Sequence, residues 1–142
     1  MFNEKERAYL KNNQMVRLGT VDSTAQPDIV PVRDEFDGQC FYVGGQYMTT
    51  SRKYKNVATG RSKIALVIDD LMPAEEGIPG IRGIRVYGTA ETVTHEGQHG
   101  PAPHLKITPT TTWSWGIESP AFGENGFTTH KTVWDQQSST VK

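Results

Sequence analysis

The sequence predicts a mainly β protein, a six-stranded antiparallel barrel with short helices, forming a single domain over residues 1–142. Fourteen glycines and eight prolines divide the chain into short segments, and about six of these segments are apolar runs of strand length. A chain of 142 residues is long enough for one core. Because a barrel of this size has little space inside, we expect a large ligand to bind outside it or between subunits.

Two short helices are predicted. The first covers residues 1–12, where Asn3 stands as N-cap and Glu6 follows three residues later, the spacing of a capping box. The second lies within residues 50–57, with Thr50 or Ser51 as its N-cap.

The predicted strands are apolar or alternating runs between turn residues. They cover residues 15–21, 29–32, 40–43, 63–68, 81–93 and 105–115, the last broken at Pro109. Pro31 marks an edge, a bulge or a place where a ligand replaces a neighbouring strand, because proline cannot donate to a ladder. Asp37-Gly38 predicts a type I′ hairpin turn.

Two segments are expected to lack strands. Residues 95–104 contain several glycines, prolines and histidines, which predicts a mobile loop over a pocket. Residues 118–142 form a polar C-terminal extension whose large apolar residues are Phe122, Phe127 and Trp134.

Composition excludes several classes of protein. Fifteen Lys and Arg against sixteen Asp and Glu leave a net charge of −1, which argues against a surface built for nucleic acid or anionic lipid. The longest apolar run, residues 64–68, is far shorter than the roughly 20 residues of a membrane-spanning helix. The N-terminus has no apolar signal region, and Cys40 is the only cysteine. We therefore expect a soluble, cytoplasmic protein without a disulfide or a cysteine-based zinc site.

A cluster of cations is the strongest chemical signal. It comprises Arg52, Lys53, Lys55, Arg61 and Lys63. Three of these stand in the first turns of the predicted second helix, where anions rather than cations complement the macrodipole. An anion bound by Ser51, Arg52 and Lys53 explains this placement. A solvated charged face is the alternative.

A second constellation combines residues 29–32 with Gly44, Gly45 and Met48. An apolar ledge beside glycine-rich backbone suits a flat heteroaromatic ring, whose faces bind apolar groups and whose edge binds main-chain groups. The alternative is that these residues are ordinary core and turn.

The ordered series of segments resembles the pyridoxamine-phosphate-oxidase-like, FMN-binding split barrels over about residues 5–117. The matching segments lie at residues 16–21, 27–32, 36–38, 51–57, 64–70 and 85–91. Residues 107–109 followed by 113–117 resemble the actinobacterial branch that uses the deazaflavin coenzyme F420. This resemblance implies a Greek-key split barrel and a homodimer with the cofactor between its two subunits.

The resemblance also implies roles for individual residues. Ser51, Arg52 and Lys53 match the start of the phosphate-binding helix. The other matches are Val30, Pro31 and Val32 along the isoalloxazine ring, and Met48, Thr49 and Thr50 at the ring edge and ribityl chain. Trp113 and Trp115 are candidates for the second subunit's wall of the site, for a substrate lid or for a dimer-interface core.

Other polar residues leave alternatives open. A metal site at His95, His99 and His104 is disfavoured, because no carboxylate or cysteine completes a recognisable spacing. Asp69 and Asp70 are either a proton-transfer pair or a solvated strand end. Cys40 is expected to be a buried small hydrophobe.

The function expected from these residues and from the resemblance is that of an F420H2-dependent reductase. It would transfer a hydride to an enone, a conjugated alkene or a quinone-like molecule, including secondary metabolites. Lys55, Arg61 and Lys63 would bind the acidic cofactor tail. Tyr87 or solvent would supply the proton.

Two alternatives stay open. One is an FMN-dependent oxidase or reductase, in which the tail-binding cations have no role because FMN lacks the tail. The other is a non-catalytic flavin or haem carrier, with an axial haem ligand among His95, His99, His104 and His130.

Overall fold

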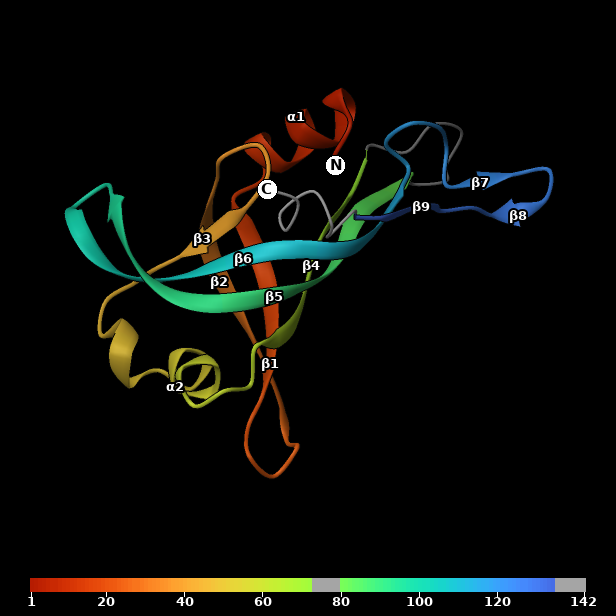
Figure 1. Ribbon diagram of the computed structural model, residues 1–142. Helices are drawn as coiled ribbons and strands as arrows, with labels where there is room; N and C mark the ends of the chain where they lie inside the picture. Colours follow the sequence, from red (N-terminus) through yellow and green to blue (C-terminus); the bar gives the residue numbers. More distant parts are fainter. Residues whose placement is uncertain (73–79, 135–142) are drawn as a thin grey trace, which may run out of the picture.

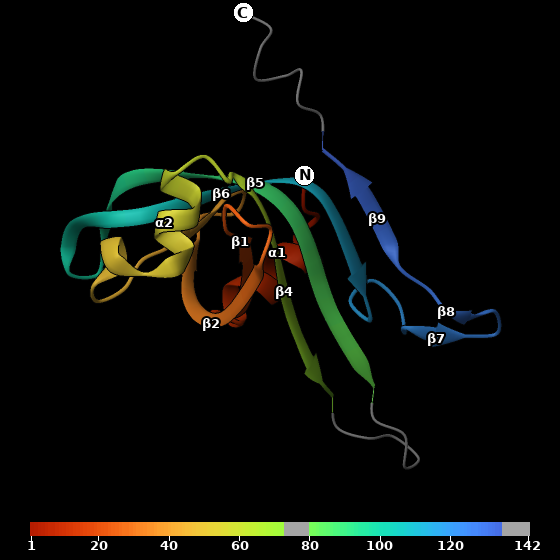
Figure 2. The same ribbon diagram turned by 90° about the horizontal axis from the view of Figure 1, so that it is seen from below.

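The computed structural model describes residues 1–72 and 80–134, so the last part of the predicted extension lies outside the described residues. The barrel strands are β1 (Met15–Val21), β2 (Pro27–Phe36), β3 (Phe41–Val43), β4 (Lys63–Leu71), β5 (Ile81–Gly97) and β6 (Gly100–Trp115). They are antiparallel neighbours in the order β3-β2-β1-β4-β5-β6, and a β3–β6 pairing closes the barrel (Figures 1 and 2). The predicted fold class and its six barrel strands are confirmed.

Helices cover the two ends of the barrel. Helix α1 (Glu4–Asn12) lies at one end and α2 (Arg52–Ala58), preceded by the 3-10 turn η1 (Met48–Thr50), lies at the other (Figure 1). The predicted capping box is present, because Glu6 N–H donates to Asn3 Oδ1 at 2.8 Å and Asn3 N–H donates to Glu6 Oε1 at 3.0 Å. In the described residues, no helix is long and apolar enough to cross a membrane.

Inward-facing apolar side chains fill the barrel. The most deeply buried include Leu18, Phe41, Leu66, Ile84, Val86, Leu105 and Ile107. Phe2 and Leu10 close the α1 end. Because the interior is occupied by side chains, a ligand of flavin size has to bind on the outside of the barrel.

The turn between β2 and β3 differs from the predicted type I′ hairpin. Its loop has four residues, 37–40, and only Gly38, at φ 101°, has a positive φ. Asp37 Oδ1 accepts from the N–H groups of Gln39 at 2.9 Å and Cys40 at 2.7 Å. The aspartate side chain thus stabilises a longer turn, so the prediction was wrong. Cys40 is buried there, as expected.

Residues 95–104 form a tight hairpin, and the predicted mobile loop was wrong. β5 and β6 pair continuously up to Gly97 opposite Gly100, leaving a two-residue turn. Gly100 has φ 90°, a backbone conformation that glycine tolerates and other residues rarely adopt. The glycines therefore serve the turn of a long two-stranded ribbon.

Pro109 does not break β6. Between Tyr87 and Gly88 of β5 the register shifts, which leaves Thr110 as an extra residue opposite them. Thr110 Oγ1 donates to Tyr87 O at 3.1 Å, and Thr110 O accepts from Trp134 N–H at 2.9 Å. A bulge thus accommodates the proline without ending the strand.

The described part of the C-terminal extension contains three short strands that the sequence analysis missed. β7 (Phe122–Gly123) and β8 (Gly126–Phe127) form a hairpin that projects from the barrel, and β9 (His130–Val133) pairs with β6 (Figure 2). Trp134 is buried, and its ring packs edge-on against Phe2 at 4.9 Å. This tryptophan anchors the extension to the barrel.

Candidate functional site

One edge of β2 is open beside the predicted ring strand. β2 pairs with β1 over residues 27–33 but with β3 only over residues 34–36. Asp34 N–H donates to Gln14 O on the β1 side at 3.0 Å, so the alternating main-chain groups of Ile29, Pro31 and Arg33 face the other edge. No strand among the described residues covers that edge, which confirms that Pro31 marks an edge.

The side chains of the ring strand divide between its two faces. Val32 is buried in the core, Val30 is half-buried against it, and Pro31 is exposed. A ring on this strand would therefore meet the proline and the main chain, while the two valines support the strand from inside.

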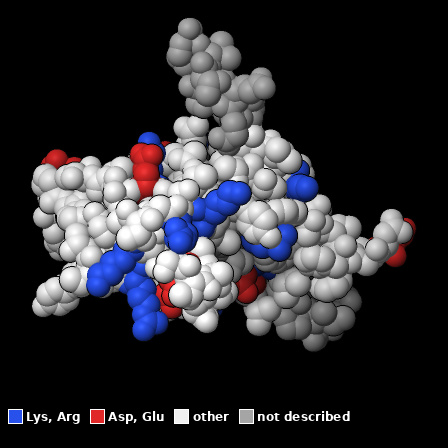
Figure 3. Space-filling view, turned by 60° about the horizontal axis from the view of Figure 1, so that its bottom comes forward, with Lys and Arg blue, Asp and Glu red and all other residues white. Residues whose placement is uncertain are grey.

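The predicted cations surround α2. Arg52, Lys55 and Lys63 are exposed, and Lys53 and Arg61 are half-buried. Among the ion pairs of the described chain, none joins these five side chains to a carboxylate within 4.0 Å. Figure 3 shows more Lys and Arg than Asp and Glu on the face that includes this end of the barrel. The cluster is thus free to bind an anion.

Of the two charged residues predicted to bind the phosphate, Lys53 is half-buried and Arg52 is exposed. Burial lowers the pKa of the Lys53 ammonium below the ordinary value, and the Asp28 carboxylate opposes this shift in part. A bound phosphate would stabilise the charged form, because it brings an opposite charge to a partly desolvated ammonium.

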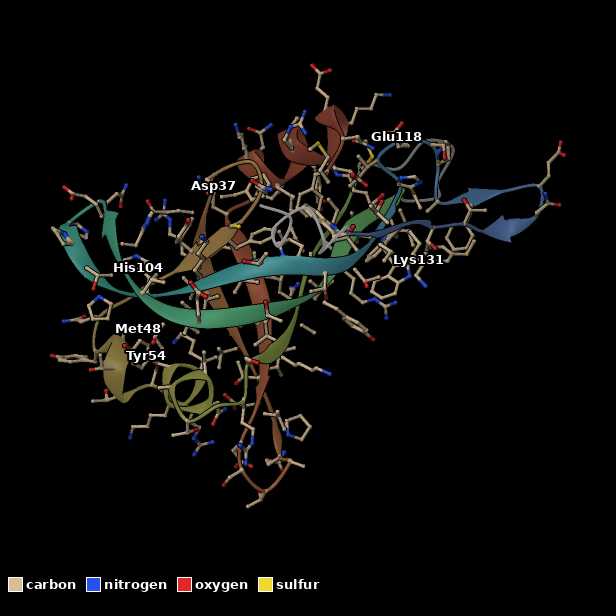
Figure 4. The ribbon with its side chains drawn as sticks, in the orientation of Figure 1. Asp37, Met48, Tyr54, His104, Glu118 and Lys131 are labelled. Carbon is tan, nitrogen blue, oxygen red and sulfur yellow. The ribbon has the colours of Figure 1, made fainter. Side chains whose placement is uncertain are left out.

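The segment before α2 offers fewer free groups than expected. Ser51 is the N-cap, and its hydroxyl donates to Met48 O at 2.6 Å and accepts from Tyr54 N–H at 3.4 Å. Met48 is buried in the core, whereas Thr49 and Thr50 are exposed. Figure 4 places Met48 and Tyr54 together at the α2 end, with His104 nearby on β6. Of the predicted ring-edge residues, the two threonines present side chains to solvent.

The predicted aromatic residues lie on the outer face of β5 and β6. Pairing aligns one row across six strands: Pro31, Arg17, Val67, Arg85, Trp113 and Lys131. The Arg85 guanidinium carbon lies 4.0 Å from the centre of the Trp113 ring, and Lys131 Nζ lies 5.7 Å from it. The half-buried Trp113 ring thus forms a cation–π cluster with two exposed cations.

Tyr87 stands in the neighbouring row and is exposed, with its ring edge-on to Trp113 at 4.8 Å. β1 and β4 separate its strand from β2. Trp115 lies further along β6, with its ring 6.4 Å from Phe127 of the projecting hairpin. Within one chain, the sheet therefore does not bring these three side chains to the open edge of β2.

Asp69 and Asp70 are held by arginines. Asp69 pairs with Arg17 at 2.6 Å, and Asp70 accepts from Arg82 at 2.8 and 2.9 Å and from Tyr9 Oη at 2.8 Å. The Arg82 hydrogen bonds keep the pKa of Asp70 below its ordinary value. Both carboxylates lie near the end of β4 and keep partly exposed side chains, as the alternative of a solvated strand end expects, and each also pairs with an arginine.

A cavity of about 770 Å³ lies between the β5–β6 hairpin and strands β2 and β3. Glu35, Tyr42, His99 and His104 are among its lining residues. Glu35 Oε2 is 3.4 Å from His95 Nε2 and 3.8 Å from His104 Nε2. We call Glu35, His95 and His104 the carboxylate–imidazole cluster.

The cluster is closely packed. His95 stacks on Tyr42 with ring centres 4.0 Å apart, and His104 Nδ1 lies 2.9 Å from Ala102 O, to which it donates. A Cβ at Gly44 would overlap the His104 imidazole, and one at Gly97 would lie 3.2 Å from Glu35 Oε2. Sequence analysis missed this arrangement because Glu35 is far from both histidines along the chain.

Asp34 was missed as well. It is 2% exposed, and neither carboxylate oxygen has a hydrogen-bond partner in the described residues. Burial raises the pKa of Asp34 to about 7. Its carboxyl faces the barrel interior, whereas Arg33 and Glu35 on either side of it are exposed.

The described residues were also compared with the ligand sets of metal sites. Among residues 1–72 and 80–134, no three His, Cys, Asp or Glu side chains are arranged to hold a metal ion. His130 lies on β9 and is exposed.

Comparison with curated proteins gives a clear relative. The chain is 32% identical over 124 residues to 5a,11a-dehydrotetracycline/5a,11a-dehydrooxytetracycline reductase of Streptomyces rimosus, covering 82% of this chain and 84% of that protein. No family model matches the chain.

Solved structures share the fold. A protein of the pyridoxine phosphate oxidase family from Clostridium acetobutylicum superposes with a TM-score of 0.62 at 14% identity, covering 95% of this chain and 99% of that one. An F420 reductase gives 0.58 at 16% identity, covering 78% and 98%. The chain belongs to the pyridoxamine-phosphate-oxidase-like split-barrel family.

The FAD-binding protein of Mycobacterium smegmatis is a further split-barrel neighbour, with a TM-score of 0.57 at 15% identity over 78% of this chain and 91% of that one. Family membership confirms the predicted resemblance, and the chain is an oxidoreductase of this split-barrel family.

Proposed function

We propose that this split-barrel oxidoreductase is an F420H2-dependent reductase of conjugated carbonyl compounds, acting in the cytoplasm. The observation that carries this proposal is the cation cluster around α2, whose members have no carboxylate partner within 4.0 Å among the described ion pairs. A cofactor with a phosphate and an oligoglutamate tail complements more cations than a phosphate alone does. The reductase relative from Streptomyces rimosus supports the same class of reaction.

The residues present fit this cofactor. Lys53 and Arg52 would bind the phosphate, with Lys53 the stronger ligand because it is already partly desolvated. Ser51 would contribute mainly by capping α2, since its hydroxyl is bonded to Met48 O. Lys55, Arg61 and Lys63 would bind the tail, and Thr49 and Thr50 would meet the ribityl chain.

The ring would lie along the open edge of β2. The main-chain groups of Ile29 and Arg33 face this edge, and Pro31 adds an apolar contact without an N–H that needs a partner. When bound, the reduced deazaflavin supplies a hydride. The chain orients the ring and excludes water from one of its faces.

A second subunit would complete the site. The outer-face row that runs from Pro31 to Trp113, whose members are exposed or half-buried, offers a surface for self-association. In such a homodimer, Trp113 and Trp115 of one subunit would form a wall of the other subunit's site. Tyr87 or solvent would then supply the proton.

The substrate class follows from the relative. That protein is named for reduction of 5a,11a-dehydrotetracycline, a polycyclic compound with a double bond conjugated to carbonyl groups. We propose a related polycyclic enone, a secondary metabolite, as the substrate.

The test is an anaerobic assay with reduced F420 and 5a,11a-dehydrotetracycline, following the recovery of oxidised F420 absorbance. The proposal expects enzyme-dependent oxidation of the cofactor matched by formation of the reduced substrate. Turnover with reduced FMN in place of reduced F420 would overturn the cofactor assignment.

A further inference from the structure

The cavity beside the β5–β6 hairpin is a built pocket. At about 770 Å³ it lies in the size range of sites for small organic ligands. Its polar groups converge from separate strands, Glu35 from β2 and His104 from β6. A Cβ at Gly44 would overlap the His104 imidazole, and a Cβ at Gly97 would crowd Glu35 Oε2 and the same imidazole.

This cavity adjoins the proposed ring site. Arg33 lines it and immediately follows Val32 on β2. Gly44, Gly45 and Gln46 also line it and lead directly into η1. The cavity therefore lies between the open β2 edge and the β5–β6 hairpin, where a molecule can approach a ring on that edge.

The wall has a defined hydrogen-bonding character. Glu35 presents a carboxylate that accepts hydrogen bonds, and Arg33 presents a guanidinium that donates them. His104 is fixed by its Nδ1–H bond to Ala102 O, so its Nε2 stays directed at the Glu35 side. The Tyr42 ring, stacked on His95, adds a flat apolar surface.

Such a wall complements a planar molecule that has a hydrogen-bond donor and an acceptor along one edge. An enolised 1,3-dicarbonyl carries a hydroxyl that donates and a carbonyl that accepts along one side. The hydroxyl suits Glu35 and Nε2 of His104, which both accept hydrogen bonds because the His104 proton is on Nδ1, and the carbonyl suits Arg33. The planar body suits the Tyr42 ring.

We propose that this cavity binds the substrate of the reductase, and that Glu35 and His104 bind its carbonyl–enol edge. This inference rests on the proposed function, because it places a polycyclic enone next to the cofactor ring. Glu35 and His104 are thereby specificity-determining residues of the substrate site.

Binding of tetracycline to the full chain without cofactor tests the inference. Tetracycline keeps the carbonyl–enol edge and lacks the 5a,11a double bond, so it binds without reacting. Calorimetric titration compares the wild type with Glu35→Gln, which keeps the side-chain shape, and with His104→Asn, whose amide can still donate to Ala102 O. Glu91→Gln is the matched control, an exposed glutamate of β5 outside the cavity.

The proposal expects Kd to rise at least about tenfold in Glu35→Gln and in His104→Asn, because a hydrogen bond to a charged or buried group is lost. Glu91→Gln should bind as the wild type does. Absence of wild-type binding, an unchanged Kd in Glu35→Gln, or an equal loss in Glu91→Gln would overturn the proposal.

Titration of the same samples with oxidised F420 separates this inference from the proposed function. F420 binding that survives both cavity substitutions, together with weakened tetracycline binding, supports both. Glu35-dependent tetracycline binding without any F420 binding would overturn the cofactor assignment and support the cavity as a site for the enol edge.

Discussion

Asn56 of α2 donates a hydrogen bond from Nδ2 to Oγ1 of Thr20 on β1 at 2.9 Å, and both side chains are buried. Asn56 O also accepts from Arg61 N–H at 3.0 Å, which fixes the turn that leads toward β4. This contact holds the helix that carries Arg52 and Lys53 against the barrel. This buried polar pair thus helps, together with the core residue Val57, to set the position of the cation cluster.

Substitution Asn56→Ala should destabilise the protein by about 1–3 kcal/mol, because it leaves the buried Thr20 hydroxyl without its partner. Denaturation in urea measures the change in the free energy of unfolding. Combining it with Thr20→Val should recover part of the loss, since both partners are then removed. A loss in Asn56→Ala below about 0.5 kcal/mol would show that the pair contributes little.

Asp34 should make stability fall as pH rises. Its folded-state pKa of about 7 lies above the ordinary 3.8, so the folded chain retains a proton that the unfolded chain releases. The stabilising contribution is fully present below 3.8 and is lost as pH rises through about 7. Between these values the free energy of unfolding should fall by up to about 1.4 kcal/mol per pH unit.

Urea denaturation at a series of pH values checks the Asp34 effect. Asp34→Asn should flatten the dependence, because the amide does not ionise, whereas exposed Glu118→Gln should keep the wild-type slope. Equal slopes in the wild type and in Asp34→Asn would contradict the assignment.

Trp134→Ala should lower the free energy of unfolding by about 3–5 kcal/mol. The tryptophan is 9% exposed, packs against Phe2, and donates from Nε1 to Thr112 Oγ1 at 3.3 Å. Val133→Ala, at a residue 70% exposed, serves as the neighbouring control and should change stability little. Thermal unfolding of both variants decides whether Trp134 anchors the extension.

Charge reversal of Lys55, Arg61 and Lys63 to glutamate should weaken F420 binding and leave FMN binding almost unchanged. These side chains are proposed to bind the acidic tail, which FMN lacks. The F420 loss should shrink at high salt, because exposed charges are screened. Equal losses for both cofactors would contradict a role specific to the tail.

Local patterns predicted much of the fold. The capping box at Asn3 and Glu6 needs only neighbouring residues, and it formed as expected. Alternating apolar residues marked the barrel strands, since one face of each strand must enter the core. Because proline lacks the donor that an interior position requires, the sequence left an edge, a bulge or a ligand-filled gap open for Pro31, and the strand pairing shows the edge.

Features that depend on distant partners were missed. β9 has four residues, of which only Val133 is a large apolar residue, and it exists because β6 offers a partner edge. The β5–β6 ribbon contains glycines and prolines near its turn. These residues locally favour a loop, so the sequence did not predict that the two strands pair there. Strand pairing brings Glu35 close to His95 and His104. Because these residues are far apart along the chain, no spacing in the sequence indicates that they form a cluster.

Fluorescence titration of the purified protein with oxidised F420 and with FMN tests the central claim most directly. We predict that F420 binds more tightly than FMN, and that Lys53→Ala abolishes F420 binding. Lys11→Ala, an exposed lysine on α1, should leave binding unchanged. Tighter binding of FMN, or F420 binding that survives Lys53→Ala, would contradict the proposed cofactor site.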